Sequence, residues 1–250
     1  MPPAPQNPKA QDAVIILAAH GSTRRPAANE TVETHAARMR AGGPFKDVRA
    51  AFLLGNAGPA DAAREIDAAT VLIVPFMMSD GYLAGEISKR IQGALKQRDG
   101  GTDIIVTDPV GTHEGIADIA RQKGDAALKH AGFDPAQATL VLVAHGSGNR
   151  PESKACGEAH AETIAASGGF AAVRLATLEE EPFLDDVLSE IAGPAAVVGL
   201  FAAPGGHAVD DVKAAIARQR CADLVDAGPV GVDPAMTALA AMRALSALED

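Results

Sequence analysis

Short runs of apolar, often β-branched residues alternate along the chain with longer segments in which apolar residues recur at helical spacing. This alternation is typical of β-α-β units around a parallel sheet. The apolar runs predict strands at 14–19, 48–54, 71–76, 103–107, 140–144, 173–178, 196–201 and 222–226. Helices are expected at 27–41, 59–68, 84–96, 114–129, 151–166, 182–191, 208–218 and 234–248. Because the strand segments are apolar throughout, we expect helices on both faces of each sheet.

The second half of the sequence repeats the first. The segment VIILAAHGSTRRP near the start corresponds to LVLVAHGSGNRP at mid-chain, and His20 and His145 lie 125 positions apart. The same offset relates Phe76 to Phe201. We therefore predict an α/β fold of two tandem flavodoxin-like, doubly wound parallel-sheet half-domains. The expected boundaries are a disordered tail at 1–11, an N-terminal half-domain at 12–130 and a C-terminal half-domain at 139–250.

Charge and composition narrow the range of partners. The 22 basic and 32 acidic side chains give a net charge of −10, which opposes non-specific binding to nucleic acid or to an anionic membrane. The longest strongly apolar stretch, Val71 to Met78, is too short to span a bilayer, and the first residues lack the layout of a signal peptide. We expect a cytoplasmic monomer or homodimer that acts on a small molecule.

The positions of the cysteines and glycines argue against disulfides, an iron–sulfur cluster and a bound nucleotide. Cys156 and Cys221 stand 65 residues apart, which suits neither a disulfide framework nor an iron–sulfur cluster. No glycine-rich nucleotide-binding loop occurs, so no nucleotide is expected.

Candidate chemistry lies at the ends of the predicted strands, because ligands bind beyond the carboxyl ends of an open parallel sheet. The first strand of each copy ends in His-Gly-Ser, at His20 and at His145. After the second strand the copies differ, since Leu54 occupies the repeat position of Glu179.

The copies differ again after the third strand, where Tyr82 faces His207 in the alignment of the repeats. The second copy thus collects His145, Glu179 and His207 at one sheet edge. Two imidazoles and a carboxylate suit Co²⁺, Fe²⁺, Ni²⁺ or Zn²⁺, and the same groups can take protons near neutral pH. We predict that these three residues form both the metal site and the catalytic site, and that the second copy is the active one.

Ordinary structural roles compete with this interpretation at several positions. Glu179 begins the run Glu179–Glu181, which also suits a solvated acidic turn. Gly205 and Gly206 either let the backbone approach a flat ligand or form a plain turn. A structural role is expected for the other histidines, which are His20, His35, His113, His130 and His160.

The strand-end motifs resemble those of the class II tetrapyrrole chelatases, in particular the two-copy CbiX/SirB-like sirohydrochlorin chelatases. The matching residues are His145-Gly146-Ser147, Glu179, Gly206-His207 with Asp211, and Gly231 to Pro234. The resemblance covers nearly the whole chain. The location of the histidine pair in the second copy is similar to that of ferrochelatases and CbiK-like cobaltochelatases.

The resemblance implies ATP-independent insertion of Co²⁺ or Fe²⁺ into sirohydrochlorin or a related tetrapyrrole, in cobalamin or sirohaem biosynthesis. His145 and His207 would hold the ion or accept the pyrrolic protons, and Glu179 would assist as a ligand or proton relay. Tetrapyrrole carboxylates would be anchored by Ser147 and Arg150. The first copy would supply a second set of anchors, namely Ser22, Arg24 and Arg25. The arginines are equally consistent with solvated surface residues.

Two other functions remain open at the level of sequence. The same histidines would serve a carrier that binds metal or tetrapyrrole without turnover. A hydrolase or phosphatase would use a strand-end histidine, but the sequence contains no nucleophile elbow to support one.

Overall fold

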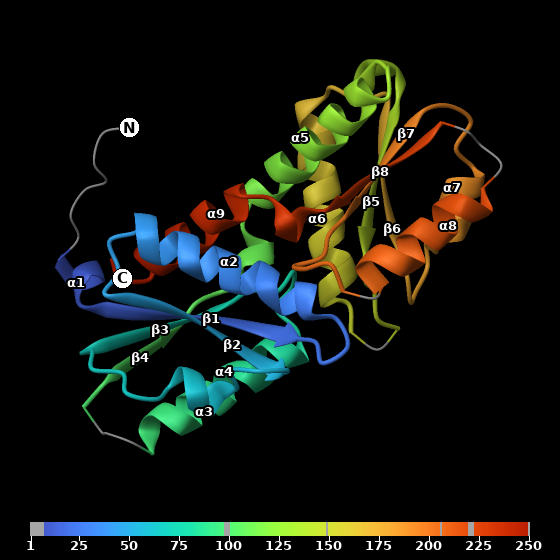
Figure 1. Ribbon diagram of the computed structural model, residues 1–250. Helices are drawn as coiled ribbons and strands as arrows, with labels where there is room; N and C mark the ends of the chain where they lie inside the picture. Colours follow the sequence, from blue (N-terminus) through green and yellow to red (C-terminus); the bar gives the residue numbers. More distant parts are fainter. Residues whose placement is uncertain (1–7, 98–100, 149, 206, 220–222, 250) are drawn as a thin grey trace. The chain divides into compact units, whose positions relative to one another are not determined.

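The computed structural model describes residues 8–97, 101–148, 150–205, 207–219 and 223–249, with the backbone alone at 207 and 208. The chain forms two compact units, one made of residues 1–113 and 234–250 and the other of residues 114–233. Each unit contains one four-stranded parallel sheet (Figure 1). The predicted α/β fold of two parallel-sheet half-domains is therefore confirmed.

The first unit has the strand order β2-β1-β3-β4. Its strands are β1 (Ala13–Gly21), β2 (Asp47–Leu54), β3 (Thr70–Pro75) and β4 (Asp103–Val106). Its helices are α1 (Pro8–Gln11), α2 (Pro26–Gly42), α3 (Pro59–Ala62), α4 (Tyr82–Lys96) and α9 (Ala235–Ser246), with a 3-10 turn at Val110–Thr112. Helices α3 and α4 pack on one face of the sheet, and α2 and α9 lie together on the other (Figure 1).

The second unit repeats this topology with the strand order β6-β5-β7-β8. Its strands are β5 (Thr139–Ala144), β6 (Ala172–Thr177), β7 (Ala195–Gly199) and β8 (Leu224–Pro229). Its α-helices are α5 (Gly115–His130), α6 (Glu152–Ser167), α7 (Leu184–Ser189) and α8 (Val212–Arg218). A π-helix at His207–Asp211 leads into α8, and 3-10 turns occupy Pro135–Gln137 and Val230–Val232.

The apolar pattern explains why these segments fold as they do. The central strands β1, β3, β5 and β7 are buried almost throughout, which matches their continuous apolar sequences. Helix α4 buries one stripe at helical spacing, formed by Ala84, Ile87, Ser88, Ile91 and Leu95. Pro26 begins α2, where its fixed φ angle favours the first helical turn.

The compact units do not coincide with the expected half-domains 12–130 and 139–250. Helix α5 ends the first sequence repeat but packs on β7, β8 and α6 of the second unit. Helix α9 ends the second repeat but packs on α2 and β3 of the first unit. Each repeat thus gives its last helix to the other unit, so the boundaries drawn from the repeat do not describe the packing.

Two local expectations also differ from the structure. Residues 8–11 of the expected disordered tail form α1, because Ala10 is buried and Lys9 Nζ donates to the Leu248 carbonyl at 3.1 Å. The helix expected at 59–68 ends at Ala62, and Glu65 has a positive φ of 53°. None of the helices in the described part of the chain is long and apolar enough to cross a membrane.

Candidate functional site

The candidate site lies at the carboxyl edge of the second sheet. Strands β6, β5 and β7 are neighbours in this sheet. Glu179 lies two residues beyond β6, His145 directly follows β5, and His207 follows the loop after β7. Because the strands are parallel, their carboxyl ends share one edge, and each of the three ends carries one of the predicted groups.

His145 and Glu179 are brought together at this edge. The His145 Nδ1 atom lies 3.7 Å from Glu179 Oε2, and the two side chains are 43% and 51% exposed. This distance is too long for a hydrogen bond but suits an ion pair when the ring is protonated. Both groups are therefore open to a ligand and close enough to act on the same one.

The backbone next to His145 influences which ring nitrogen is available. The His145 Nδ1 atom lies 3.0 Å from the Gly146 carbonyl. With its proton on Nδ1, the ring donates to this carbonyl and carries its lone pair on Nε2. Histidines that bind metals commonly donate their other ring N–H to a backbone carbonyl in this way.

His207 begins the π-helix that ends at Asp211. The Val209 amide donates to the Gly205 carbonyl at 3.2 Å, which ties this turn to the preceding loop. Single π-helical turns occur frequently at functional sites. The side chain of His207 and the whole of Gly206 lie outside the described residues, so two of the three predicted groups are placed as side chains. Among the described side chains, no group of three or more His, Cys, Asp and Glu is arranged to hold a metal ion.

Two interpretations were open for the glycines before His207, a plain turn or a close approach to a flat ligand, and the loop does contain a turn. The Gly205 amide donates to the Ala203 carbonyl at 2.8 Å. A Cβ atom at Gly205 would meet nothing within 4 Å, so this glycine faces open space. The turn and an approach by a flat ligand are therefore compatible.

The predicted anchoring residues have different surroundings. The Ser147 amide donates to Glu180 Oε1 at 2.8 Å, and the Arg150 amide donates to the Ser147 carbonyl at 3.0 Å. Arg150 is exposed beside the start of α6. Bonds from their backbone amides therefore hold both residues, with the Arg150 side chain exposed and Ser147 half-buried.

Ser22 in the first copy has a structural task. Its hydroxyl accepts from the amides of Arg24 and Arg25 at 3.2 and 3.0 Å, and its own amide donates to Asn29 Oδ1 at 2.8 Å. These bonds form the turn that leads into α2. An anchoring role for the Ser22 side chain would compete with this turn.

The first sheet carries a different set of side chains at the equivalent edge. His20 is exposed at the end of β1. Leu54 and Tyr82 are 44% and 58% exposed at the repeat positions of Glu179 and His207. An aliphatic group and a phenol replace a carboxylate and an imidazole here, so the first copy lacks the predicted ligand set.

Two of the remaining histidines serve the core. His35 is 1% exposed, and its Nδ1 lies 2.7 Å from the Thr237 hydroxyl on α9. His160 is 5% exposed, and its Nε2 lies 3.5 Å from Cys156 Sγ. Burial raises the pKa of the Cys156 thiol, so this sulfur stays protonated and unreactive near neutral pH.

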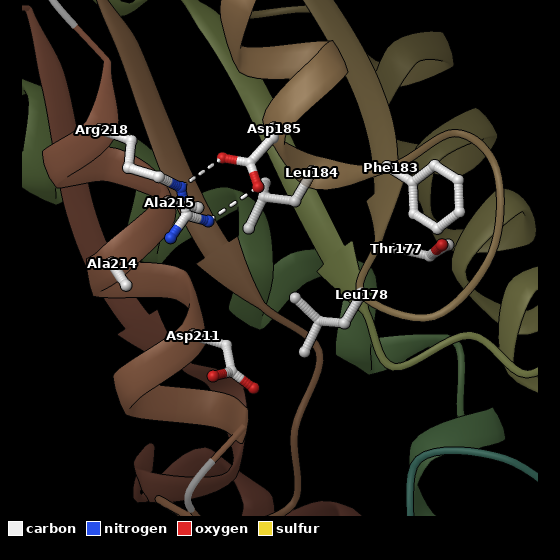
Figure 2. Close-up of a pocket in the computed structure, with 9 residues that line it drawn as sticks. All are labelled: Thr177, Leu178, Phe183, Leu184, Asp185, Asp211, Ala214, Ala215 and Arg218. Atoms are coloured by element: carbon white, nitrogen blue, oxygen red, sulfur yellow. Dashed lines mark hydrogen bonds and ion pairs between the residues drawn. The ribbon is translucent and has the colours of Figure 1, made fainter.

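The sequence did not indicate a cavity of about 240 Å³ between α7, α8 and the end of β6. Figure 2 shows the ion pair at its rim, where Arg218 donates to both carboxylate oxygens of Asp185 at 3.0 and 2.7 Å. Asp211, the last residue of the π-helix, also lines it. The cavity therefore adjoins the turn that starts at His207, although no pattern in the sequence distinguishes its lining residues.

Glu180, whose carboxylate binds the backbone of the His145 loop, was also missed at the level of sequence. Glu180 belongs to the acidic run that was equally consistent with a solvated turn, yet its carboxylate holds the Ser147 amide. The one available signal is the repeat itself, because Glu180 corresponds to Gly55 in the first copy.

Comparison with known proteins identifies relatives over both units. The CbiX family model matches residues 14–127 and again residues 139–247. A probable sirohydrochlorin cobaltochelatase of Halobacterium salinarum is 27% identical over 219 residues, which are 79% of this chain and 74% of that protein.

Two solved structures share the fold of the chain. CbiX, described as the terminal enzyme of sirohaem biosynthesis in denitrifying bacteria, is 26% identical with a TM-score of 0.75, over 94% of this chain and 99% of that one. A multi-domain protein of Deinococcus radiodurans with structural similarity to chelatases is 25% identical with a TM-score of 0.80. That match covers 95% of this chain, which spans only 56% of the Deinococcus protein.

Proposed function

Because the chain belongs to the CbiX family, we propose that it inserts a divalent metal ion, Co²⁺ or Fe²⁺, into sirohydrochlorin without ATP. The site for this reaction is the carboxyl edge of the second sheet. The single observation that carries the assignment of the site is the difference between the copies. His145 and Glu179 lie 3.7 Å apart in the second unit, whereas Leu54 stands at the position of Glu179 in the first.

Insertion of a divalent ion requires three events at one place. The ion must lose water, the macrocycle must present its nitrogen lone pairs, and two pyrrolic protons must leave. An imidazole nitrogen can coordinate a metal ion or accept a proton, so His145 can serve in either role. Glu179 stabilises the imidazolium that forms when the ring takes a proton, because its carboxylate lies within ion-pair distance.

His207 supplies the second imidazole in this proposal. It follows β7, which neighbours β5 in the sheet, and its backbone begins the π-helix. The ligand set of two imidazoles and one carboxylate suits Co²⁺ and Fe²⁺ equally well. The relatives support both metals, since one is named a cobaltochelatase and another acts in sirohaem biosynthesis.

The acidic periphery of sirohydrochlorin needs positive or hydrogen-bonding partners. Arg150 is exposed at the start of α6, five residues after His145. A guanidinium group at this place suits bidentate binding of a carboxylate. Ser147 lies in the same turn and adds a hydroxyl.

The proposal is tested by metallation of sirohydrochlorin with Co²⁺ and with Fe²⁺, followed by the visible spectrum of the pigment. We expect wild-type protein to turn over many equivalents per chain. His145→Ala and His207→Ala should each lower the rate by at least about 100-fold, within the range for loss of a general acid–base group.

The matched control is His20→Ala, which removes the histidine at the same position of the first copy. It should retain most of the activity. Equal losses in His20→Ala and His207→Ala would contradict the assignment of the site to the second copy, and conversion that stops at one equivalent per chain would indicate a carrier.

A further inference from the structure

We propose that Glu180 and Thr177 are positioning residues that hold the loop of His145 against the loop of Glu179. This inference rests on the proposed function of the His145 and Glu179 pair. Neither residue needs to contact the metal or the tetrapyrrole. Their task is to add a side-chain bridge to the backbone bonds that hold the loops of these two exposed side chains together.

The two loops are first joined through the backbone. The His145 carbonyl accepts from the amides of Leu178 and Glu179 at 3.1 and 3.0 Å. These bonds fix where the backbone of Glu179 lies relative to that of His145. They use the carbonyl before the glycine turn and leave the amides after it to be satisfied by other groups.

Glu180 satisfies one of those amides. Its Oε1 atom accepts from the Ser147 amide at 2.8 Å, across 33 positions of sequence. Glu180 follows Glu179 directly, and Ser147 lies two residues beyond His145. The side chain of Glu180 therefore bridges the two ligand-bearing loops, and a bond to a carboxylate is stronger than one between neutral groups.

Thr177 fixes Glu180 in turn. The Thr177 side chain is fully buried at the end of β6. Its hydroxyl donates to the Glu180 carbonyl and accepts from the Glu180 amide, the latter at 3.3 Å. The buried hydroxyl thus holds both backbone groups of Glu180, so the carboxylate is aimed from a rigid strand end.

The first copy lacks this bridge. Gly55 stands at the repeat position of Glu180, and Phe52 stands at that of Thr177. The Ser22 amide, equivalent to that of Ser147, donates to Asn29 Oδ1 on α2, the helix that follows it. A Cβ atom at Gly55 would collide with Asn29 Nδ2, so the asparagine occupies the space that a longer side chain would need.

The two copies therefore solve the same structural problem in different ways. The first copy satisfies the amide locally, and strand pairing that reaches Gly21 and Leu54 joins its two strand ends through the backbone alone. Only the copy with the predicted ligand set adds a side-chain carboxylate that bridges the two loops. This correlation assigns the bridge to the site and not to the stability of the sheet edge.

The decisive experiment compares Glu180→Ala with Glu180→Gln in the full-length protein. Affinity for Co²⁺ alone is measured by calorimetric titration, and KM for Co²⁺ and kcat are measured with sirohydrochlorin. Removing a group that orients a metal ligand commonly weakens affinity by about 10- to 100-fold. We expect Glu180→Ala to raise Kd and KM for Co²⁺ at least about tenfold. Glu180→Gln keeps an acceptor oxygen and should stay within about threefold of wild type.

Glu181→Ala is the matched control, because it removes the same charge from the next residue in the chain. It should bind Co²⁺ as wild type does. Equal affinities for Glu180→Ala and Glu181→Ala would overturn the proposal, as would a Glu180→Gln variant as weak as Glu180→Ala. Amide exchange at Ser147 gives an independent readout, since protection should fall in Glu180→Ala and return in Glu180→Gln.

If Glu180→Ala does not fold, Thr177→Val and Thr177→Ser decide the question. Valine keeps the volume but loses the hydroxyl, so it should weaken Co²⁺ binding, whereas serine should restore it. Equal binding by both would overturn the proposal. Co²⁺ binding that depends on Glu180 without any metallation by wild type would refute the proposed function while leaving the bridge intact, and wild type that binds no Co²⁺ would refute both.

Discussion

At the residue scale, Gly146 shows how closely the two loops of the site approach. Its φ angle is +76°, in the left-handed region that side chains disfavour. A Cβ atom there would lie 2.9 Å from Thr177 Cβ and 3.0 Å from Glu180 Cγ. The glycine after His145 is therefore required both by its backbone angle and by the bridge behind it.

We expect Gly146→Ala to lower the free energy of unfolding by about 1–3 kcal/mol. The new Cβ atom would strain the backbone at its positive φ angle and would also displace the Glu180 side chain. Metallation should fall further than stability alone explains. Gly148→Ala is the control, since a Cβ atom there would meet nothing within 4 Å. Denaturant titration and initial rates measure the two effects, and similar values for both variants would contradict the steric argument.

At the scale of elements, the start of β2 is tied to the end of α2 by charge. Asp47 accepts from Arg49 Nε at 2.8 Å and from Arg40 Nε at 3.0 Å. Its Oδ1 atom also accepts from the Val48 amide at 2.8 Å. Burial raises the pKa of the Asp47 carboxyl, but the bonds from Arg49, Arg40 and Val48 outweigh it and hold the pKa below its ordinary value of 3.8.

Because the pKa of Asp47 is lower in the folded state than in the unfolded chain, the free energy of unfolding falls as the solution becomes more acidic. The contribution of Asp47 is complete above its pKa in the unfolded chain and is lost as the pH falls through the lower folded value. We expect Asp47→Asn to be less stable than wild type by at most about 1 kcal/mol at pH 7, since the arginines are partly exposed. The difference should shrink below about pH 4. Urea titrations at pH 7 and about pH 3 check this, and a difference that grows in acid would contradict it.

At the scale of the whole molecule, the exchange of last helices between the repeats decides which fragments can fold. Helix α5 contributes a buried stripe to the second unit, formed by Ile116, Ala117, Ile119, Ala120, Gly124 and Leu128. Burying the three large aliphatic side chains of this stripe stabilises the unit by roughly 5–9 kcal/mol. This is comparable to the total stability of a small domain.

We therefore expect a fragment of residues 114–233 to fold cooperatively, and a fragment of residues 139–250 to remain largely unfolded. The second fragment lacks α5 and carries α9, which packs on α2 and β3 of the first unit. Thermal melts followed by circular dichroism distinguish the two. A cooperative transition in 139–250, with none in 114–233, would show that the repeat and not the packing defines the folding unit.

Much of the fold follows from local pattern in the sequence. All eight strands begin within two residues of their predicted starts, because continuous apolar runs between turn residues can be buried only inside a sheet with helices on both faces. The repeat by itself makes His20 equivalent to His145 and Leu54 equivalent to Glu179. The shared edge of parallel strands then brings His145 and Glu179 within 3.7 Å of each other.

Only the tertiary structure determined the packing partners of the last helices and the hydrogen bond of Glu180. The exchange of α5 and α9 depends on which of the two sheets each helix packs against, and the two helices have similar apolar stripes. The role of Glu180 depends on a hydrogen bond to Ser147 across 33 residues, whereas in the sequence it is one of three consecutive glutamates. Local periodicity determines which segments become strands and helices, but long-range packing determines their partners, because burial and hydrogen bonding act between atoms that are neighbours only in space.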